Sequence, residues 1–318
     1  MVRIGYALSS EEHTAPDLVR NAQRAEAIGL DFVSVSDHYH PWVEAQGQSP
    51  FVWAVLGGIA ATTERIGVAT GVTCPIMRIH PAVIAQATAT VATMLPGRFT
   101  FGVGSGEALN EHVTGEHWPE VDVRLEMLDE AVHVIRELWE GGLYSHRGTH
   151  FTVENARLYS RPDTPPPIVV SGAGPKATEL AGRIGDGYWG MGPNAELVET
   201  YRKAGGEGPT YAQVTCCWGP EEKAARRTAF EVWPNAGLSG QLAQELALPS
   251  YFEAAAEPLT EEKATENLPC GPDVAPYVES FRTYVDAGFD HVYFHQIGQD
   301  QQGFLDFCER ELLPRLRD

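Results

Sequence analysis

Residues 33–42 read VSVSDHYHPW, an apolar, β-branched run that changes abruptly into acidic, imidazole and aromatic side chains. Such a run is typical of a buried strand of about 4–8 residues that ends in a loop. Helical patterns with one apolar face separate comparable runs, as at 15–29, 121–140 and 272–287. The alternation predicts an α/β protein with a parallel sheet, and eight such units predict a closed (β/α)8 TIM barrel. The strands are expected at 2–8, 31–36, 66–72, 99–103, 167–171, 186–189, 210–217 and 291–295.

Length and composition favour one domain over residues 1–318. The chain has 318 residues, 43% of them hydrophobic, which suffices for the core of one barrel. Two stretches interrupt the alternation: 146–166 reads as an extended excursion and 234–270 as a helical, acidic insertion. Insertions on barrels commonly form the lid or one wall of the pocket, so both are expected beside the active site.

The charge balance argues against a nucleic-acid partner. Asp and Glu number 43 against 23 Lys and Arg, a formal net charge of -20, whereas binding to a phosphate backbone needs clustered cations. No run of about 18 apolar residues is present, so no membrane partner is expected. The five cysteines form no CxxC pair, and their odd number fits free thiols in a reducing compartment. We therefore expect a cytoplasmic protein that acts on a small molecule.

Polar and glycine residues follow most of the expected strands. In a TIM barrel the carboxyl ends of all strands meet at one mouth, where active sites lie, so these residues are expected to converge. They are Glu11 after the first strand; Asp37, His38 and Trp42 after the second; Gly71 and Val72 after the third; Gly106, Glu107 and Asn110 after the fourth; Ser171, Gly172, Ala173 and Gly174 after the fifth; and His295 and Gln296 after the eighth.

The segment at 33–42 allows three interpretations. Asp37 and His38 could simply close the strand through hydrogen bonds to the backbone. His38 and His40 form an HxH pair of the kind that some barrel hydrolases use for a metal, but SGAGP at 171–175 offers no further ligand, so no metal is expected. In the third interpretation His38 is the proton carrier of a hydride-transfer site.

Two glycine-rich stretches favour a flat or phosphorylated ligand. In GVGSGEALNE, residues 102–111, the glycines let the backbone approach a ligand, and Glu107 follows as a carboxyl that a partly buried pocket could hold protonated. The spacing does not match the dinucleotide fingerprint of Rossmann folds. In VVSGAGPK, residues 169–176, Pro175 opens a helix whose free N–H groups can bind a phosphate, or the glycines only serve a tight connection.

Together these stretches resemble the luciferase-like barrel superfamily, in the branch that uses the 8-hydroxy-5-deazaflavin coenzyme F420. The pattern is closest to that of the F420-dependent glucose-6-phosphate dehydrogenases, and the similarity spans nearly the whole chain. Their segments SDHFxPW, TxxRxxPAVIAQ and GVGxGEALNE resemble SDHYHPW at 36–42, CPIMRIHPAVIAQ at 74–86 and GVGSGEALNE at 102–111.

The resemblance implies a role for each matched residue. His38 would be the base that takes the hydroxyl proton, Trp42 would stack beside the deazaflavin, Glu107 would be the acid, and Glu11 matches a further acidic position. It also implies a non-prolyl cis peptide at Gly71–Val72 and a homodimer, which is the habit of the family. The coenzyme would be held by Asp37, Gly71, Val72, Gly106, Asn110, Ser171, Gly172, Ala173 and Gly174.

One departure from the pattern concerns the substrate. The sugar-phosphate enzymes hold the phosphate with lysines and an arginine, but the matching regions here, GMGPNAELVE at 190–199 and the insertion, contain only Lys263. We therefore expect a neutral alcohol or ketone, with Trp189, Leu248, Tyr251 and Phe252 as candidate pocket residues.

Three alternatives stay open. A true sugar-phosphate dehydrogenase would need Arg202, Lys203 or Lys263 to face the pocket. An FMN-dependent luciferase-like monooxygenase would use the same barrel. A non-catalytic binding protein of the family would have no need for His38, Trp42 and Glu107 at one mouth.

Overall fold

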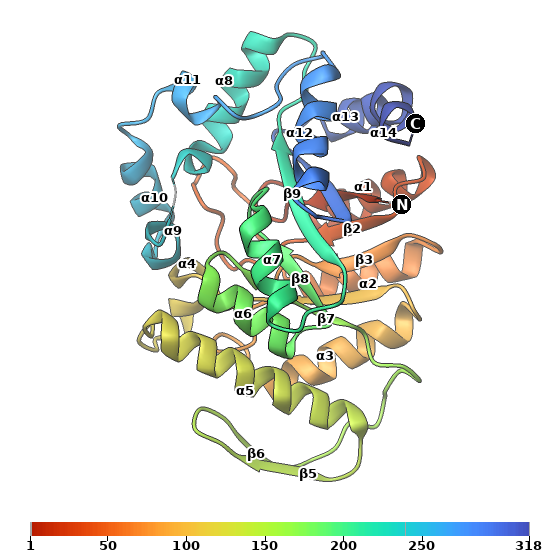
Figure 1. Ribbon diagram of the computed structural model, residues 1–318, viewed down its shortest axis with the longest axis vertical. Helices are drawn as coiled ribbons and strands as arrows, with labels where there is room; N and C mark the ends of the chain where they lie inside the picture. The colour runs from red at the N-terminus through yellow and green to blue at the C-terminus, as the bar shows by residue number, and fades with distance from the viewer. Residues whose placement is uncertain (1, 239, 318) are drawn as a thin grey trace.

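The computed structural model describes residues 2–238 and 240–317, and Met1, Ser239 and Asp318 of the expected domain lie outside the described residues. Its centre is a closed parallel barrel with the strand order β1-β10-β9-β8-β7-β4-β3-β2 (Figure 1). The predicted (β/α)8 barrel is confirmed, and every expected strand lies within two residues of its expected bounds. The barrel strands are β1 (Arg3–Leu8), β2 (Phe32–Val35), β3 (Gly67–Thr70), β4 (Phe99–Val103), β7 (Ile168–Gly172), β8 (Gly187–Gly190), β9 (Thr210–Cys216) and β10 (His291–Gln296).

Helices form the outer layer around the barrel. None of the described helices is both long and apolar enough to cross a membrane. The helices are α1 (Ala15–Ala27), α2 (Val52–Thr62), α3 (Pro81–Met94), α4 (Ala108–Glu111), α5 (Val121–Glu140), α6 (Pro175–Ile184), α7 (Ala195–Lys203), α8 (Glu222–Val232), α9 (Leu242–Glu245), α10 (Pro249–Ala256), α11 (Glu261–Ala264), α12 (Ala275–Asp286), α13 (Gln301–Phe307) and α14 (Leu313–Arg317), with single turns at His112–Thr114, Pro234–Gly237 and Cys308–Leu312.

The three predicted helices correspond to α1, α5 and α12. In α1 the Thr14 side chain caps the first turn, and Leu18, Ala22 and Ala25, spaced by three or four residues, are fully buried. The helix α12 begins at Ala275 rather than at 272, because Asp273 accepts a hydrogen bond from the Ala275 amide and so belongs to the preceding turn.

Each strand divides its side chains between two cores. On β10, Val292 and Phe294 pack outward against the helices, whereas Tyr293 points into the barrel. Because side chains alternate along a strand, His295 also points inward, one layer nearer the carboxyl end. Tyr293 belongs to an inner layer of seven buried side chains: Ala7, Phe32, Ala69, Val169, Trp189, Tyr211 and Tyr293. This layer fills the barrel below the mouth.

The two insertions lie in different places. Residues 146–156 of the first stretch belong to an antiparallel hairpin of β5 (Tyr144–Arg147) and β6 (Thr152–Ala156), which lies below α5 in Figure 1. Glu130 of α5 holds this hairpin by accepting hydrogen bonds from the backbone amides of residues 149–151. Its expected place beside the active site is therefore wrong, because its backbone bonds tie it to the outer face of α5.

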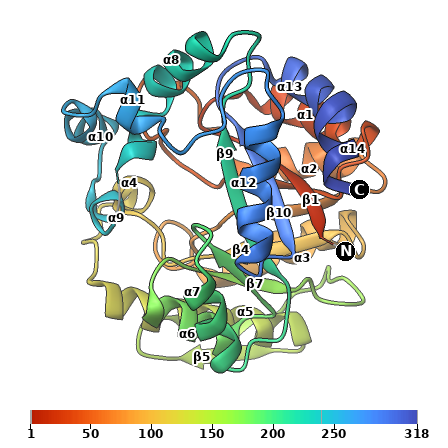
Figure 2. The ribbon, with the colours of Figure 1, turned by 45° about the horizontal axis from the view of Figure 1, so that its top comes forward.

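The 234–270 insertion is helical, as predicted, and comprises the turn at Pro234–Gly237 and α9, α10 and α11. In Figures 1 and 2 α9 lies beside α4, whereas α11 lies beside α8. Phe252 of α10 is fully buried and packs with Val43 in the loop after β2 and with Leu109 in α4. This insertion therefore covers the carboxyl end of the barrel.

Candidate active site

His38 and Glu11 meet at the mouth of the barrel, after β2 and β1. Nε2 of His38 lies 3.4 Å from Oε1 of Glu11, and its Nδ1 lies 3.2 Å from the carbonyl oxygen of His40. Burial alone would raise the pKa of Glu11, but the charge of protonated His38 and the hydrogen bonds from Ser36 and Ser9 outweigh it, so this pKa is lowered. Glu11 is thus an ionised carboxylate, and a carboxylate in this position can stabilise an imidazolium at His38.

Trp42 lies between His38 and the insertion. Its ring centroid is 4.9 Å from that of His38 and 5.2 Å from that of Phe252, and its backbone amide donates to Gln46 at 2.8 Å. Trp42 therefore connects the imidazole with the α10 helix that covers the mouth.

Glu107 and Asn110 lie on the loop and helix that follow β4. Glu107 is half-buried and precedes α4, and its Oε2 lies 3.4 Å from the side-chain amide of Asn110. The Asn110 oxygen accepts hydrogen bonds from the backbone amides of Tyr39 and His40 at 2.8 and 3.2 Å. Asn110 thus fixes the segment that carries His38 relative to Glu107.

A buried charged network lies beneath these residues. Nη2 of Arg78 donates to Oδ1 of Asp37 at 2.8 Å, and the Thr73 hydroxyl donates to Oδ2 at the same distance. Glu111 accepts from the backbone amide of Arg78 at 2.8 Å, and Nε of Arg78 lies 3.5 Å from its Oε1. Burial raises the pKa of Glu111 to about 7, although Arg78 acts in the opposite direction. Each oxygen of the Asp37 carboxylate thus accepts a hydrogen bond from within the protein, which anchors the loop that carries His38.

The Gly71–Val72 peptide is cis, as the resemblance implied. A Cβ atom on Gly71 would lie 2.0 Å from Oγ of Ser34 and 3.0 Å from Cζ2 of Trp189. Trp189 therefore belongs to the inner layer below this peptide, where its Nε1 donates to the Tyr293 hydroxyl at 3.0 Å, and not to the pocket wall where we expected it.

We expect Gly71→Ala to lower the free energy of unfolding by at least about 1–3 kcal/mol, because the methyl group would overlap the Ser34 hydroxyl in a packed layer. Thermal and urea denaturation measure the change. Gly57→Ala in α2 is the matched control: a Cβ there meets nothing within 4 Å, so a small stabilisation of about 0.5–1 kcal/mol is expected. Equal behaviour of the two variants would contradict the close packing under Gly71.

The Ser171–Gly174 turn joins β7 to α6. The Tyr188 hydroxyl donates to the carbonyl oxygen of Gly172 at 2.9 Å, and no side chain caps the first turn of α6. Lys176 in this turn pairs with Asp122 at 2.8 Å at the start of α5. The uncapped amides of the ten-residue helix α6 are available to an anion at the mouth.

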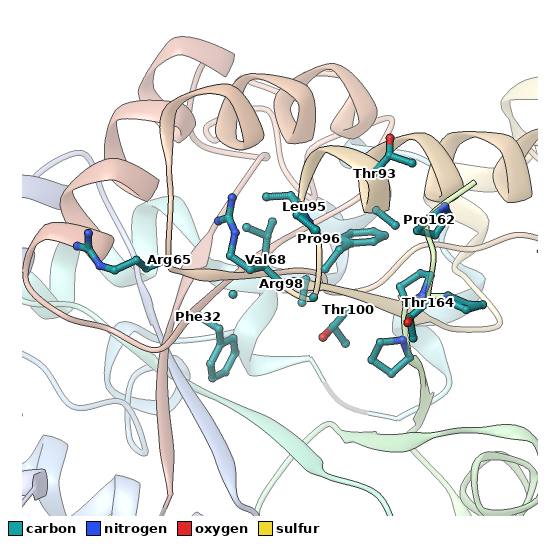
Figure 3. Close-up of a pocket in the computed structure, with 18 of the residues that line it drawn as sticks. Phe32, Arg65, Val68, Thr93, Leu95, Pro96, Arg98, Thr100, Pro162 and Thr164 are labelled. Carbon is teal, nitrogen blue, oxygen red and sulfur yellow. The ribbon is translucent and has the colours of Figure 1, made fainter. Parts of the chain in front are cut away.

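A cavity of about 750 Å³ lies at the opposite end of the barrel, where the strands begin (Figure 3). Phe32 and Thr100 line it, and several arginines surround it. Two of them have partners within the protein: Arg3 pairs with Asp31 at 2.9 Å, and Arg98 donates to the carbonyl oxygens of Thr63 and Ile66. Because this end of a TIM barrel serves stability, the candidate active site is the mouth.

The mouth offers no preformed metal centre. Across residues 2–238 and 240–317, no group of three or more His, Cys, Asp or Glu side chains is arranged to hold an ion. His40 of the HxH pair instead faces the carbonyl oxygen of Leu109 through Nδ1, at 2.8 Å.

Comparisons with known proteins identify the family of this chain. Residues 1–291 match the luciferase-like monooxygenase family. The chain is 38% identical over 99% of its length to the F420-dependent glucose-6-phosphate dehydrogenase of Microbacterium testaceum and 37% identical over 100% to that of Beutenbergia cavernae, in each case over 98% of the relative.

Solved structures agree with these sequence matches. An F420-dependent secondary alcohol dehydrogenase, in complex with an F420-acetone adduct, has a TM-score of 0.91 and 33% identity, covering 100% of this chain and 99% of that chain. The F420-dependent tetrahydromethanopterin reductase of Methanopyrus kandleri, at 19% identity over 99% of both chains and a TM-score of 0.80, shares the fold. The barrel fold and these matches over nearly the whole chain show that the chain belongs to the luciferase-like monooxygenase family.

Proposed function

We propose that the protein is an F420-dependent oxidoreductase that moves a hydride between a hydroxyl-bearing carbon and the deazaflavin. The observation that carries this proposal is the position of His38, with Glu11 at 3.4 Å and the tilted ring of Trp42 packed against it, at the mouth of a barrel whose relatives are F420-dependent dehydrogenases. An imidazole backed by a carboxylate is suited to exchange a proton with an alcohol.

The residues at the mouth fit a flat coenzyme that carries a phosphate. A Cβ on Gly104 would lie 2.9 Å from Val72, and one on Gly106 would lie 2.5 Å from Sγ of Cys74, so the backbone there leaves a surface free of side chains. The ring would lie against the Gly71–Val72 peptide, with Trp42 nearby. The first-turn amides of α6 and the Ser171–Gly174 turn would hold the phosphate.

F420 supplies the carbon that accepts or donates the hydride. His38 takes the proton of the substrate hydroxyl in the oxidising direction and returns it in the reducing direction. Glu11 stabilises the resulting imidazolium, and Asn110 holds the backbone of residues 39–40 so that the imidazole is oriented. Glu107 would hold or supply a proton for the bound coenzyme, and the insertion around Phe252 excludes water.

The charges around the mouth favour a neutral alcohol over a sugar phosphate. Arg202 donates to the carbonyl oxygens of Gly206 and Gly208, and Lys203 pairs with Glu199 at 2.7 Å. Both stand in the last turn of α7. Since the helix after a barrel strand runs back toward the strand beginnings, they lie away from the mouth.

The covering insertion adds no compensating cation. Lys263 is exposed on α11, directly after Glu261 and Glu262, where a phosphate dianion would meet repulsion. Exposed Tyr39, Met191, Leu248 and Tyr251 follow β2 and β8 or belong to the insertion, and they offer apolar surface to a substrate. A secondary alcohol, or its ketone in the reverse direction, fits these groups.

A sugar-phosphate dehydrogenase is the second candidate function, because the curated relatives at 36–38% identity carry that name. The FMN-dependent monooxygenase of the sequence analysis is the third, since the matching family is named luciferase-like monooxygenase. The coenzyme and the substrate are therefore tested separately.

Titration of the purified protein with F420, followed by tryptophan fluorescence, is expected to give a dissociation constant of about 1 μM or lower, with little response to FMN. Loss of the oxidised deazaflavin absorbance then compares 2-propanol and 2-butanol with glucose 6-phosphate. The neutral alcohols are expected to react at least about tenfold faster at equal concentration, because Arg202 and Lys203 are held elsewhere and Lys263 stands beside two glutamates. Preference for FMN overturns the coenzyme assignment. Preference for glucose 6-phosphate overturns only the substrate assignment.

We also expect a cytoplasmic homodimer. All five cysteines are buried free thiols, which fits a reducing compartment, and twofold dimers are the commonest closed assembly. Light scattering of the purified protein tests the dimer.

A further inference from the structure

Two consecutive glutamates at the end of β1 face opposite sides of the barrel mouth. Glu11 lies beside His38 after β2, as described above. Oε1 of Glu12 lies 3.6 Å from Nε2 of His295 at the end of β10, the strand that pairs with β1 on its other side. The mouth therefore contains two imidazole–carboxylate pairs, one on each side of β1, and the proposed reaction uses only the first.

His295 is buried without a hydrogen-bond partner. The residue is 2% exposed, and neither ring nitrogen has a partner among the described residues. Since Tyr293 belongs to the inner layer, the His295 ring stands above it on the inner side of the barrel. A buried polar group without a partner is costly, and in a native structure it calls for an explanation such as a ligand.

The surroundings of His295 determine what that ligand can be. Trp233, directly before the insertion, packs edge-on against His295 with ring centroids 4.5 Å apart, and its Nε1 donates to Glu12. The Gly298 amide also donates to Glu12, at 2.8 Å. Burial lowers the pKa of the neighbouring His13, so that ring adds no positive charge at neutral pH.

A hydroxyl group fits this environment better than a phosphate or a carbonyl. The Glu12 carboxylate would repel a phosphate, and a carbonyl oxygen could not donate to it. A hydroxyl can accept from a ring N–H and donate to a carboxylate at the same time. It would give His295 the partner that the protein itself does not provide.

We propose that His295 and Glu12 bind a second hydroxyl group of the substrate, while His38 and Glu11 act on the hydroxyl that is oxidised. This inference rests on the proposed oxidoreductase function and narrows its substrate class to neutral diols and other polyhydroxy compounds. The two pairs follow β2 and β10, the two neighbours of β1. Neighbouring strands lie about 4.8 Å apart, so the pairs start about 10 Å apart at the backbone, and their side chains face one mouth.

The test compares 2-pentanol with pentanediols that carry a second hydroxyl at C3, C4 or C5. In the wild type at least one diol is expected to have a kcat/KM at least about tenfold above that of 2-pentanol, as one well-made hydrogen bond allows. His295→Phe keeps an aromatic ring against Trp233 but removes both nitrogens, and it should bring this ratio to about one. His117→Phe, at an exposed site in the loop before α5, is the matched control and should keep the wild-type ratio.

A second readout does not depend on turnover. The preferred diol should raise the midpoint of thermal unfolding of the wild type more than 2-pentanol does at equal concentration, and His295→Phe should abolish the difference. A wild type without diol preference, or a His295→Phe variant that keeps it or loses activity on both alcohols equally, overturns the inference. If F420 does not bind, or no alcohol is oxidised, the proposed function is wrong as well. If 2-pentanol is oxidised but no diol is preferred to it, only this inference is wrong.

Discussion

The His38→Asn variant is expected to lower kcat for alcohol oxidation by about 10²- to 10⁴-fold, the usual contribution of a general base. Asparagine can keep a polar contact with Glu11, but it cannot accept a proton. The affinity for F420 should change little, because His38 is held by Glu11 and the His40 backbone and not by groups that we assign to the coenzyme. Stopped-flow loss of the deazaflavin absorbance measures the rate, and fluorescence titration measures the affinity.

The pH dependence of the same rate identifies the titrating group. In the wild type the oxidation rate should fall with decreasing pH across the range in which imidazoles titrate, about 5 to 8. The pKa of Glu11 is lowered, so its carboxylate stays charged throughout this range and does not cause the fall. His38→Asn should flatten the profile, and His117→Asn at an exposed site should preserve it. A flat wild-type profile, or an unchanged one in His38→Asn, would count against His38 as the base.

The barrel was predictable because its signals are local. Each strand is a short apolar run, and a rule about strand ends then places His38, Trp42 and Glu107 at one mouth without knowledge of any long-range contact. The cis peptide at Gly71–Val72 is different: its position came from resemblance alone, since neither residue type reveals it in the sequence.

The supporting contacts could not be predicted, because they join residues far apart in the chain. Arg78 stands in the largely apolar segment IMRIHP, and nothing local indicates that it reaches Asp37 and Glu111. Likewise, two adjacent glutamates do not reveal that Glu11 faces β2 while Glu12 faces β10. The one available signal was the strand-end rule, which had already placed His295 at the mouth.

The 146–166 insertion was recognised in the sequence, but its place in the fold was not predicted. The prediction of extended structure was correct. However, a break in the strand–helix alternation does not show against which layer of the barrel the extra residues pack. Glu130, 16 residues before His146 along the chain, decides this by binding the hairpin backbone to α5. Insertions are therefore easier to recognise in a sequence than to place in a fold.

Replacing Arg78 by methionine is expected to lower the free energy of unfolding by about 3–5 kcal/mol, the usual loss when one partner of a buried ion pair is removed. The side chains of Arg78, Asp37 and Glu111 are each at most 7% exposed, so water cannot replace the lost guanidinium. Urea denaturation measures the change. Arg315→Met, which breaks an ion pair whose side chains are about half exposed, is the matched control and should cost only about 0.5 kcal/mol.

The loss in Arg78→Met should also grow with pH. The pKa of Glu111 is about 7 in the folded protein, above the value of about 4.3 for an unfolded chain. Its contribution to stability is therefore fully present below about pH 4 and is lost as the pH rises through 7. Without Arg78 the ionised form of Glu111 is still less favourable in the folded protein. The loss in free energy of unfolding in Arg78→Met should therefore be larger near pH 8.5 than near pH 6. A deficit that matches Arg315→Met, or one that shrinks with rising pH, would show that Arg78 does not hold these two carboxylates together under the site.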